Sequence, residues 1–211
     1  AHRFLTNALA KKRASDAILS EEGCAHACHP KRSSMERVWI LDPLDGTREF
    51  GEQPRTDWAV HVALAIAGKP AAGAVALPGL GATFSTAKPP DVSGLPPTPE
   101  SPRIVVSRSR PDSGVLEVIK SVGGRAVEMG SAGAKAMAVV RGDAEAYLHA
   151  GGQYEWDSCA PVAVALTAGL HASRIDGSPL IYNRPDPYLP DLLICRRDLA
   201  KQLLSALAAH L

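Results

Sequence analysis

The sequence predicts an α/β protein in which strands dominate the first half and strands alternate with helices in the second. From residue 103 onward, short apolar runs of strand length alternate with longer runs of helix length, which is typical of α/β domains. Between the two halves lies a stretch with six prolines, residues 88–102. Such a segment is expected to be extended and semi-rigid, so it marks a boundary between two predicted subdomains.

We therefore expect an N-terminal α+β subdomain over residues 1–87, a proline-rich linker over residues 88–102 and a C-terminal α/β subdomain over residues 103–211. The alternative is that the proline-rich stretch is a long surface loop inside one domain. The chain has 211 residues, 45% of them hydrophobic, and is long enough to bury a substantial core in either arrangement.

Individual elements are placed from apolar periodicity and turn residues. The continuous apolar run at residues 37–41 indicates a buried strand, and Gly68-Lys69-Pro70 indicates a turn between two strands. The polar residues 24–36 are expected to form a loop. Strands are expected at residues 17–20, 37–41, 58–67, 71–77, 82–86, 103–107, 125–128, 145–149 and 192–195. Helices are expected at residues 5–14, 115–122, 132–141, 160–170 and 199–211.

The charge balance argues against two classes of partner. The formal net charge is +1, without a basic tail or a long charge run, whereas proteins that bind nucleic-acid polymers or anionic membranes usually carry a basic surface. A small phosphorylated substrate needs only a local cationic site. No apolar run reaches the length of a membrane span and the first residues do not resemble a secretory signal, so we expect a cytoplasmic protein.

The four cysteines do not suggest a disulfide framework, and a cytosolic location keeps thiols reduced. Cys24, His26, Cys28 and His29 supply two thiols and two imidazoles, the donor set of a tetrahedral zinc site. Four ligands within six residues crowd one another, however, and zinc pairs are usually separated by a long loop. We therefore favour a surface loop with free thiols over a Zn²⁺ site.

The segment around Asp42 carries the clearest chemical signal. An apolar strand reaches Asp42, Pro43 predicts that the chain turns there, and Asp45 follows in the same turn. Gly46 frees the backbone and Thr47 is suited to cap a following helical turn. Two carboxylates held this close repel each other unless a divalent cation lies between them, and hard oxygen ligands favour magnesium, manganese or calcium over zinc. The alternative is an ordinary, well-made turn.

Main-chain N–H groups at Gly46 and Thr47 would point at an anion, as the first N–H groups of a helix do. Two further acids stand at comparable places. Glu21 follows a short strand, and Asp157 precedes a long apolar helix with Pro161 in its first turn. Alone, Glu21 reads as part of a solvated acidic turn, and Asp157 as a helix N-cap that stabilises by about 1 kcal/mol.

Together, three segments closely resemble the inositol monophosphatase-like superfamily of lithium-sensitive, magnesium-dependent phosphatases. They are Ser20-Glu21-Glu22, residues 42–50 (Asp-Pro-Leu-Asp-Gly-Thr-Arg-Glu-Phe) and residues 156–161 (Trp-Asp-Ser-Cys-Ala-Pro). The resemblance runs from near residue 1 to the end of the chain and implies a layered αβαβα sandwich. Within the superfamily the chain is most similar to actinobacterial 3'(2'),5'-bisphosphate nucleotidases of the CysQ type, in residues 19–22, 47–50, 105–110, 130–135 and 186–191.

The resemblance implies an activity and partners. These enzymes remove the 3'-phosphate of adenosine 3',5'-bisphosphate, a product of sulfate assimilation, and many family members form homodimers. Inositol monophosphatase or fructose-1,6-bisphosphatase activity is the alternative in the same class. A non-catalytic metal- or nucleotide-binding protein is the alternative of another class. The family's earlier N-terminal helices, and an acidic residue that helps to position a further metal or the water, have no counterpart in this sequence.

The resemblance also implies residue roles around two or three Mg²⁺ ions, with Mn²⁺ as a substitute. Glu21, Asp42 and the Leu44 carbonyl would bind one ion, and Asp42, Asp45 and Asp157 a second. Glu21, Asp45 and Thr47 would form the catalytic set, in which Glu21 and Thr47 orient the attacking water. The expected phosphate and substrate contacts are Gly46, Thr47, Ser107, Arg108, Gly130, Ser131 and Lys135. For Arg108 and Lys135 the alternative is a solvated surface charge.

Overall fold

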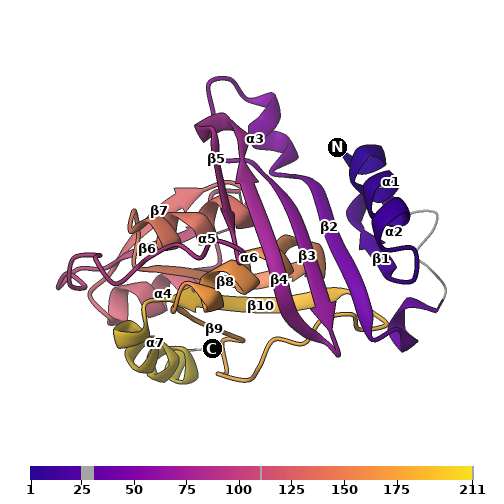
Figure 1. Ribbon diagram of the computed structural model, residues 1–211. Helices are drawn as coiled ribbons and strands as arrows, with labels where there is room; N and C mark the ends of the chain where they lie inside the picture. Colours follow the sequence, from indigo (N-terminus) through magenta and orange to yellow (C-terminus); the bar gives the residue numbers. More distant parts are fainter. Residues whose placement is uncertain (25–30, 110, 211) are drawn as a thin grey trace.

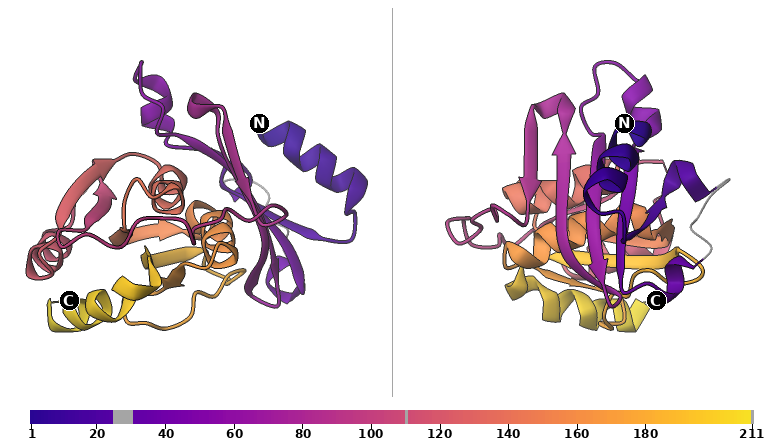
Figure 2. Two further views of the ribbon diagram at one scale, coloured as in Figure 1. Left: turned by 60° about the vertical axis from the view of Figure 1, so that its left-hand side comes forward. Right: turned by 45° about the vertical axis from the view of Figure 1, so that its right-hand side comes forward.

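The computed structural model describes residues 1–24, 31–109 and 111–210 (Figure 1). Two five-stranded sheets stand face to face with a pair of helices between them and further helices on their outer faces. Figure 2 shows this succession of helix, sheet, helix, sheet and helix most clearly in its left-hand view. The layered αβαβα arrangement predicted from the sequence is confirmed.

The first sheet has the strand order β1-β2-β3-β4-β5. Its strands are β1 (Ala17–Ser20), β2 (Arg37–Asp45), β3 (Ala59–Ile66), β4 (Lys69–Leu77) and β5 (Ala82–Ser85). β1 pairs parallel with β2, and the remaining neighbours are antiparallel. All five strands were expected: β1 has the expected bounds, and the ends of the others differ from the expected ones by at most four residues.

Strand β2 does not end at Asp42, so the expected turn at Pro43 is wrong. The strand continues to Asp45 through a register shift against β3 between Asp42 and Asp45. A bulge inserts one extra residue without ending the ladder, and it accommodates a proline that has no N–H to donate. The bulge keeps both aspartates on one strand.

The turn between β3 and β4 lies one residue earlier than expected. Ala67 and Gly68 both have positive φ, 47° and 76°, as a two-residue type I′ hairpin turn requires. Lys69 and Pro70 already belong to β4.

The second sheet has the order β7-β6-β8-β10-β9. Its strands are β6 (Arg103–Ser107), β7 (Arg125–Met129), β8 (Ala146–Tyr154), β9 (His171–Ser173) and β10 (Tyr188–Cys195). β6 pairs parallel with β7 and β8, whereas β10 pairs antiparallel with β8 and β9. β8 and β10 are longer than expected, and β9 was not expected because three residues carry no periodicity that a sequence pattern can detect.

The helices are α1 (His2–Lys12), α2 (Glu21–Cys24), α3 (Thr47–Gly51), α4 (Ser113–Ser121), α5 (Ala132–Arg141), α6 (Glu155–Thr167) and α7 (Arg197–His210), with 3₁₀ turns at Arg32–Ser34 and Pro78–Leu80. α5 has the expected bounds. α6 begins five residues before its expected start at residue 160, so Asp157 lies inside the helix and Pro161 lies in its interior rather than its first turn. The segment expected to be a loop, residues 24–36, contains the 3₁₀ turn Arg32–Ser34. The short helix α2 ends at the first residue of this segment, Cys24.

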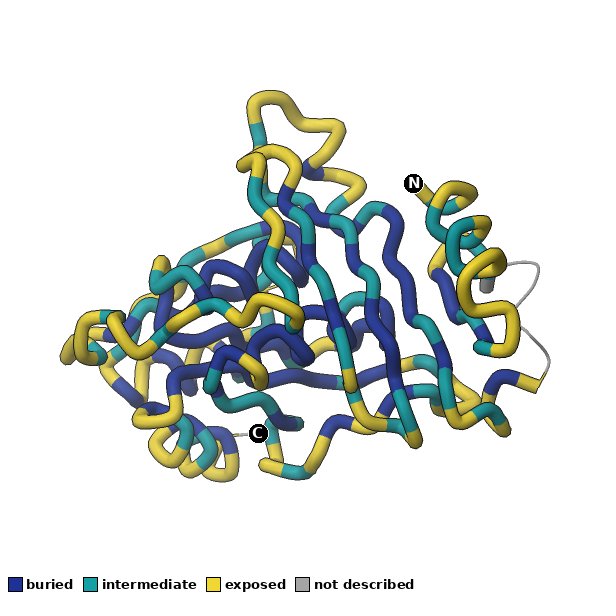
Figure 3. The backbone as a smooth tube through the Cα atoms, in the orientation of Figure 1, coloured by how far each residue is buried: buried dark blue, intermediate teal, exposed yellow. Residues whose placement is uncertain are grey.

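Helices α5 and α6 form the centre of the core because both sheets pack against them (Figure 3). All residues of α5 from Ala132 to Val140 are buried, which requires small side chains around the whole helix. α6 approaches β4 so closely that a Cβ on Gly73 would lie 2.9 Å from the Ala160 carbonyl oxygen. A second apolar cluster lies between the second sheet and α4 and α7.

The proline-rich segment 88–102 connects β5 to β6. Apart from an isolated bridge between Lys88 and Ser85, it is irregular, with a few turns and bends. The central apolar cluster contains residues from both sides of this segment. The division into two subdomains stays a prediction. Within the described ranges, no helix combines the length and apolar character needed to cross a membrane.

Candidate active site

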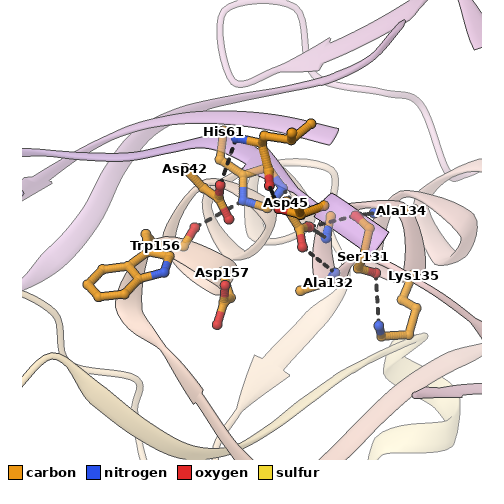
Figure 4. A network of polar contacts seen from close by, with 12 residues as sticks. Asp42, Asp45, His61, Ser131, Ala132, Ala134, Lys135, Trp156 and Asp157 are labelled. Atoms are coloured by element: carbon orange, nitrogen blue, oxygen red, sulfur yellow. Dashed lines mark hydrogen bonds and ion pairs between the residues drawn. The ribbon is translucent and has the colours of Figure 1, made fainter. Parts of the chain in front are cut away.

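The sheet register brings the first two acidic segments together. In the parallel pair β1–β2, Ser20 lies beside Leu41, so the next residues, Glu21 at the start of α2 and Asp42 within β2, lie next to each other where β1 ends. Parallel strands end side by side, which places side chains from distant parts of the sequence within reach of one another. Asp45, the first turn of α6 and the start of α5 meet at the same place (Figure 4).

Asp42 is almost fully buried, with 1% of its surface exposed. Its Oδ1 accepts a hydrogen bond from the Leu44 N–H at 3.0 Å. The pKa of Asp42 is raised to about 9, chiefly by burial and then by the negative charges of Asp45, Glu21 and Asp157, against the opposing effect of His61. The negative charges around this carboxyl group therefore outweigh the positive charge that His61 supplies.

Asp45 is held as an anion by the start of α5. Its carboxylate accepts hydrogen bonds from the Ser131 hydroxyl at 2.5 Å, the Gly133 N–H at 2.7 Å and the Ala132 N–H at 3.2 Å. Burial alone would raise the pKa of Asp45, but His61 and these donors outweigh it and lower the pKa to about 2. A helix N-terminus favours negative charge, so Asp45 is fixed in position and ionised.

His61 is a functional residue that the sequence analysis missed. It lies opposite Asp42 on β3 and is fully buried. Its Nδ1 donates to the Trp156 carbonyl oxygen at 3.0 Å, and its Nε2 lies 3.2 Å from Oδ2 of Asp45. Burial would lower the pKa of His61, but Asp45 and Asp42 raise it to about 9, so the ring is a buried cation. The available signal was a histidine on the buried face of an alternating strand, between Ala59 and Ala63.

Asp157 lies within the first turn of α6 instead of preceding the helix as its N-cap. Its Oδ2 accepts a hydrogen bond from the Tyr154 N–H at 2.7 Å, closing the helix N-terminus from the third position. The pKa of Asp157 is raised to about 7, chiefly by desolvation and then by the charges of Asp45 and Glu21. Asp157 is thus a second, half-buried acid in a negatively charged environment.

The geometry and the charges together fit a divalent cation. Ligand atoms of Asp42, Asp45 and His61 lie within 4.8 Å of one another in a buried cluster. Glu21 and Asp157 are near enough to affect the pKa of Asp42. One imidazolium cannot neutralise these carboxylates, and carboxylate oxygens are the donors that hard divalent cations prefer. Both ring nitrogens of His61 face protein oxygens, the Trp156 carbonyl at 3.0 Å and Oδ2 of Asp45 at 3.2 Å, so we assign His61 to positioning Asp45 rather than to the donor set.

Thr47 does not cap the following helix as expected. Gly46 occupies the N-cap position in a left-handed conformation, and Thr47 is the first residue of α3. The Thr47 hydroxyl donates to the Leu44 carbonyl oxygen at 3.1 Å. A side chain at Gly46 would be strained at φ 82° and would approach the Ser131 Cβ to 3.0 Å, so this position requires glycine.

A polar cavity adjoins the carboxylates. Four of the predicted substrate contacts line it, namely Ser107, Gly130, Ser131 and Lys135. Lys135 is buried, so it is not a solvated surface charge. Its Nζ donates to the Ser131 carbonyl oxygen at 2.9 Å and lies 5.2 Å from the centre of the Tyr147 ring. Burial lowers the pKa of Lys135, as expected for a cation in a poorly hydrated pocket.

Arg108 is another predicted substrate contact, and its guanidinium pairs with protein carboxylates. It lies 2.7 Å from Glu49 and 3.0 Å from Glu52. A role in substrate binding therefore stays a prediction.

Glu49 packs tightly against Gly130, because a Cβ added to Gly130 would lie 2.1 Å from Cδ of Glu49. The Gly130 N–H donates to Asp57 at 2.7 Å, so these acids, which the motif analysis passed over, attach α3 and its loop to the start of α5.

The predicted zinc ligands are not settled by this geometry, because His26, Cys28 and His29 lie outside the described residues, as does the side chain of Cys24. Among the described residues, Cys159 and Cys195 are free and buried.

Comparisons with known proteins agree with the site. The model of the inositol monophosphatase family matches residues 1–211. The chain is 50% identical over 214 residues to a 3'-phosphoadenosine 5'-phosphate phosphatase from Mycobacterium tuberculosis, covering 99% of this chain and 79% of the relative. It is 31% identical over 170 residues to the 3'(2'),5'-bisphosphate nucleotidase CysQ of Escherichia coli K12, covering 75% and 67%.

Solved structures show the same fold at low identity. Inositol monophosphatase II from Staphylococcus aureus superposes with a TM-score of 0.79 at 22% identity, covering 99% of this chain and 80% of that one. The inositol monophosphatase of Anabaena has a TM-score of 0.79 at 21% identity, covering 100% and 85%. The family match and the close relatives lead to one conclusion: this chain belongs to the inositol monophosphatase family.

Proposed function

We propose that this protein is a bisphosphate nucleotidase that hydrolyses the 3'-phosphate of adenosine 3',5'-bisphosphate to give AMP and phosphate. It would remove the 3'-phosphate of 3'-phosphoadenosine 5'-phosphosulfate in the same way, giving adenosine 5'-phosphosulfate. The observation that carries the proposal is a buried carboxylate cluster beside a polar cavity. It occurs in a chain that shares half its residues with a relative named for this substrate.

We propose Mg²⁺ as the cofactor, in two or three ions, with Mn²⁺ as a substitute. Glu21, Asp42 and the Leu44 carbonyl would hold one ion, and Asp42, Asp45 and Asp157 a second. When bound, the ions supply Lewis-acid stabilisation of the charge that develops on the phosphoryl group and the leaving oxygen. The all-oxygen donor set supports magnesium over zinc.

The protein's own groups would then orient the reactants. The Thr47 hydroxyl proton is directed to the Leu44 carbonyl, which leaves the hydroxyl oxygen to accept a hydrogen bond from the attacking water. Glu21 would orient the same water from the other side. The water attacks phosphorus, the bond between phosphorus and the 3'-oxygen breaks, and AMP leaves with a free 3'-hydroxyl group that takes its proton from the water.

Substrate positioning falls to the cavity and to the turn after β2. Gly46 and Thr47 would hold the scissile phosphate, while Lys135 supplies a buried positive charge close to Asp45. A cation in a poorly hydrated cavity attracts phosphate more strongly than one in water. Ser107, Gly130 and Ser131 would add hydrogen bonds.

A comparison of phosphate release tests the proposal. With Mg²⁺ present, we expect kcat/KM for adenosine 3',5'-bisphosphate to exceed the values for inositol 1-phosphate and fructose 1,6-bisphosphate. Much faster turnover of the inositol or sugar phosphate would contradict it. Nucleotide binding by calorimetry without any phosphate release would favour the non-catalytic alternative.

Three further expectations belong to this proposal: inhibition by lithium, a cytoplasmic location and a homodimer. Lithium titration of phosphate release, cell fractionation and sedimentation of the purified protein test them separately.

A further inference from the structure

Gln153 is a buried polar residue of the candidate active-site cavity. Only 7% of its surface is exposed, and it lines the same cavity as Lys135 and Asp157. Within the part of the chain that the structure describes, neither its Nε2 nor its Oε1 has a hydrogen-bond partner. An unpaired buried donor or acceptor costs about 1–3 kcal/mol, so a native protein retains such an amide only for a purpose that the free fold does not show.

The local backbone directs this side chain into the cavity. Gln153 lies near the end of β8, paired with Leu189 of β10, four residues before Asp157. The preceding Gly152 has φ 82°, and a Cβ there would lie 2.2 Å from the Tyr188 hydroxyl. The tyrosine ring thus closes one side of the strand end, and the position of Gln153 is defined before any ligand binds.

The chemistry of the amide indicates which part of a ligand it takes. A glutamine offers a donor and an acceptor side by side, whereas an ionised phosphate only accepts and would leave Oε1 unpaired. Lys135 is the buried cation suited to phosphate in this cavity. A ribose hydroxyl or the edge of an adenine base presents a donor together with an acceptor and satisfies both amide atoms.

We propose that Gln153 is a specificity-determining residue that binds the paired donor and acceptor groups of the leaving nucleoside. This inference rests on the proposed function. The amide distinguishes a nucleoside leaving group from an apolar or purely anionic one, because a substrate without these groups leaves the amide unpaired.

The test uses the full chain with Mg²⁺ and the substitution Gln153→Leu, which removes both polar atoms at similar volume. We expect kcat/KM for adenosine 3',5'-bisphosphate to fall about tenfold to hundredfold, the range of a bidentate amide contact. The loss should shrink for the 2'-deoxy analogue if the partner is the ribose hydroxyl, and for the purine riboside analogue, which lacks the amino group, if it is the base. The inference is overturned if the substitution lowers kcat/KM for both analogues as much as for adenosine 3',5'-bisphosphate, or if it does not lower kcat/KM for adenosine 3',5'-bisphosphate at all.

Thermal unfolding of the free protein separates recognition from a structural role. Because Gln153→Leu removes an unsatisfied amide, Tm should stay unchanged or rise by about 2–4 °C. A clear fall in Tm would mean that the amide supports the fold, and would overturn the inference. Gln202→Leu, at an exposed position on α7, is the matched control and should change neither Tm nor kcat/KM.

The two proposals fail in different ways. If the wild-type protein does not hydrolyse adenosine 3',5'-bisphosphate, the proposed function fails and the inference with it. If the wild type does so but Gln153→Leu is as active as Gln202→Leu, only the inference fails.

Discussion

Asp42 and Glu145 are equally buried acids, each with 1% of its surface exposed, yet their environments shift their pKa values in opposite directions. Glu145 accepts hydrogen bonds from Arg103 through the backbone N–H at 2.6 Å, Nε at 3.1 Å and a terminal nitrogen at 2.6 Å. Burial alone would raise its pKa, but Arg103 outweighs burial and lowers it. Asp42 has acids as neighbours, and its pKa rises to about 9.

The difference shows how a structural acid can be told from a functional one. A buried carboxylate whose charge is balanced by a hydrogen-bonded guanidinium needs no ligand to stabilise it. A buried carboxylate crowded by other carboxylates costs stability and is explained only by a cation that the folded protein is built to receive. Substitutions around Asp42 and at Glu145 test this difference.

The largest effect is expected from Asp157→Asn. The asparagine oxygen can still accept the Tyr154 N–H, so α6 should begin at the same residue. Loss of the charge should lower kcat on the order of a thousandfold or more, because charge stabilisation in such sites is usually the largest catalytic contribution. Steady-state kinetics measure kcat, and circular dichroism measures whether the helix content is retained. A native spectrum with undiminished kcat would refute the assignment of Asp157 to the cation site.

The next effect concerns Asp42→Asn and the response to Mg²⁺. In the wild type, Mg²⁺ at a hundred times its Kd should stabilise the fold by about 2.7 kcal/mol. In the variant this gain should disappear, while the metal-free protein should become more stable, because a buried asparagine does not have to take up a proton on folding as Asp42 does with its raised pKa. Thermal unfolding with EDTA and with Mg²⁺ measures both changes. An unchanged Mg²⁺ response would show that Asp42 does not bind the ion.

Glu145→Gln should have the opposite profile. We expect the free energy of unfolding to fall by about 2–4 kcal/mol, because Arg103 is left beside a neutral amide, with kcat/KM and the Mg²⁺ response unchanged. Since the pKa of Glu145 is lowered in the fold, its stabilisation is present above the ordinary carboxyl value and lost as pH falls through the lowered value. Urea unfolding at neutral and acidic pH should therefore show the gap between wild type and variant narrowing in acid. A gap that widens in acid would contradict the paired state.

The smallest effect is expected from Ser131→Ala, which touches both fold and site. The Ser131 hydroxyl donates to Asp45 and accepts from the Ala134 N–H at 3.0 Å as the N-cap of α5. We expect a stability loss of about 1 kcal/mol and a kcat about tenfold lower, since Asp45 loses one of its fixed donors. Ser121→Ala on α4, whose hydroxyl contacts only the Val118 carbonyl at 2.8 Å, is the control. Equal kinetics in both variants would show that Ser131 does not position Asp45.

Local patterns in the sequence were sufficient for much of the molecule. Apolar runs placed nine of the ten strands, and helix α5 was predicted with its observed bounds. The acidic motifs predicted Asp42 and Asp45, which the structure places in one buried cluster, and the family to which the chain belongs. These features are readable because periodicity, turn residues and motif spacing act over a few neighbouring residues.

Only the tertiary structure decided which side chains meet. His61 became the counter-charge of the site because the β2–β3 register sets it opposite Asp42, and a shift of one residue would have turned it to the other face. The start of α5 binds Asp45, Arg108 pairs with Glu49, and Gln153 is buried without a partner. Strand register and helix packing join residues far apart in the chain, so no local pattern of the sequence contains them.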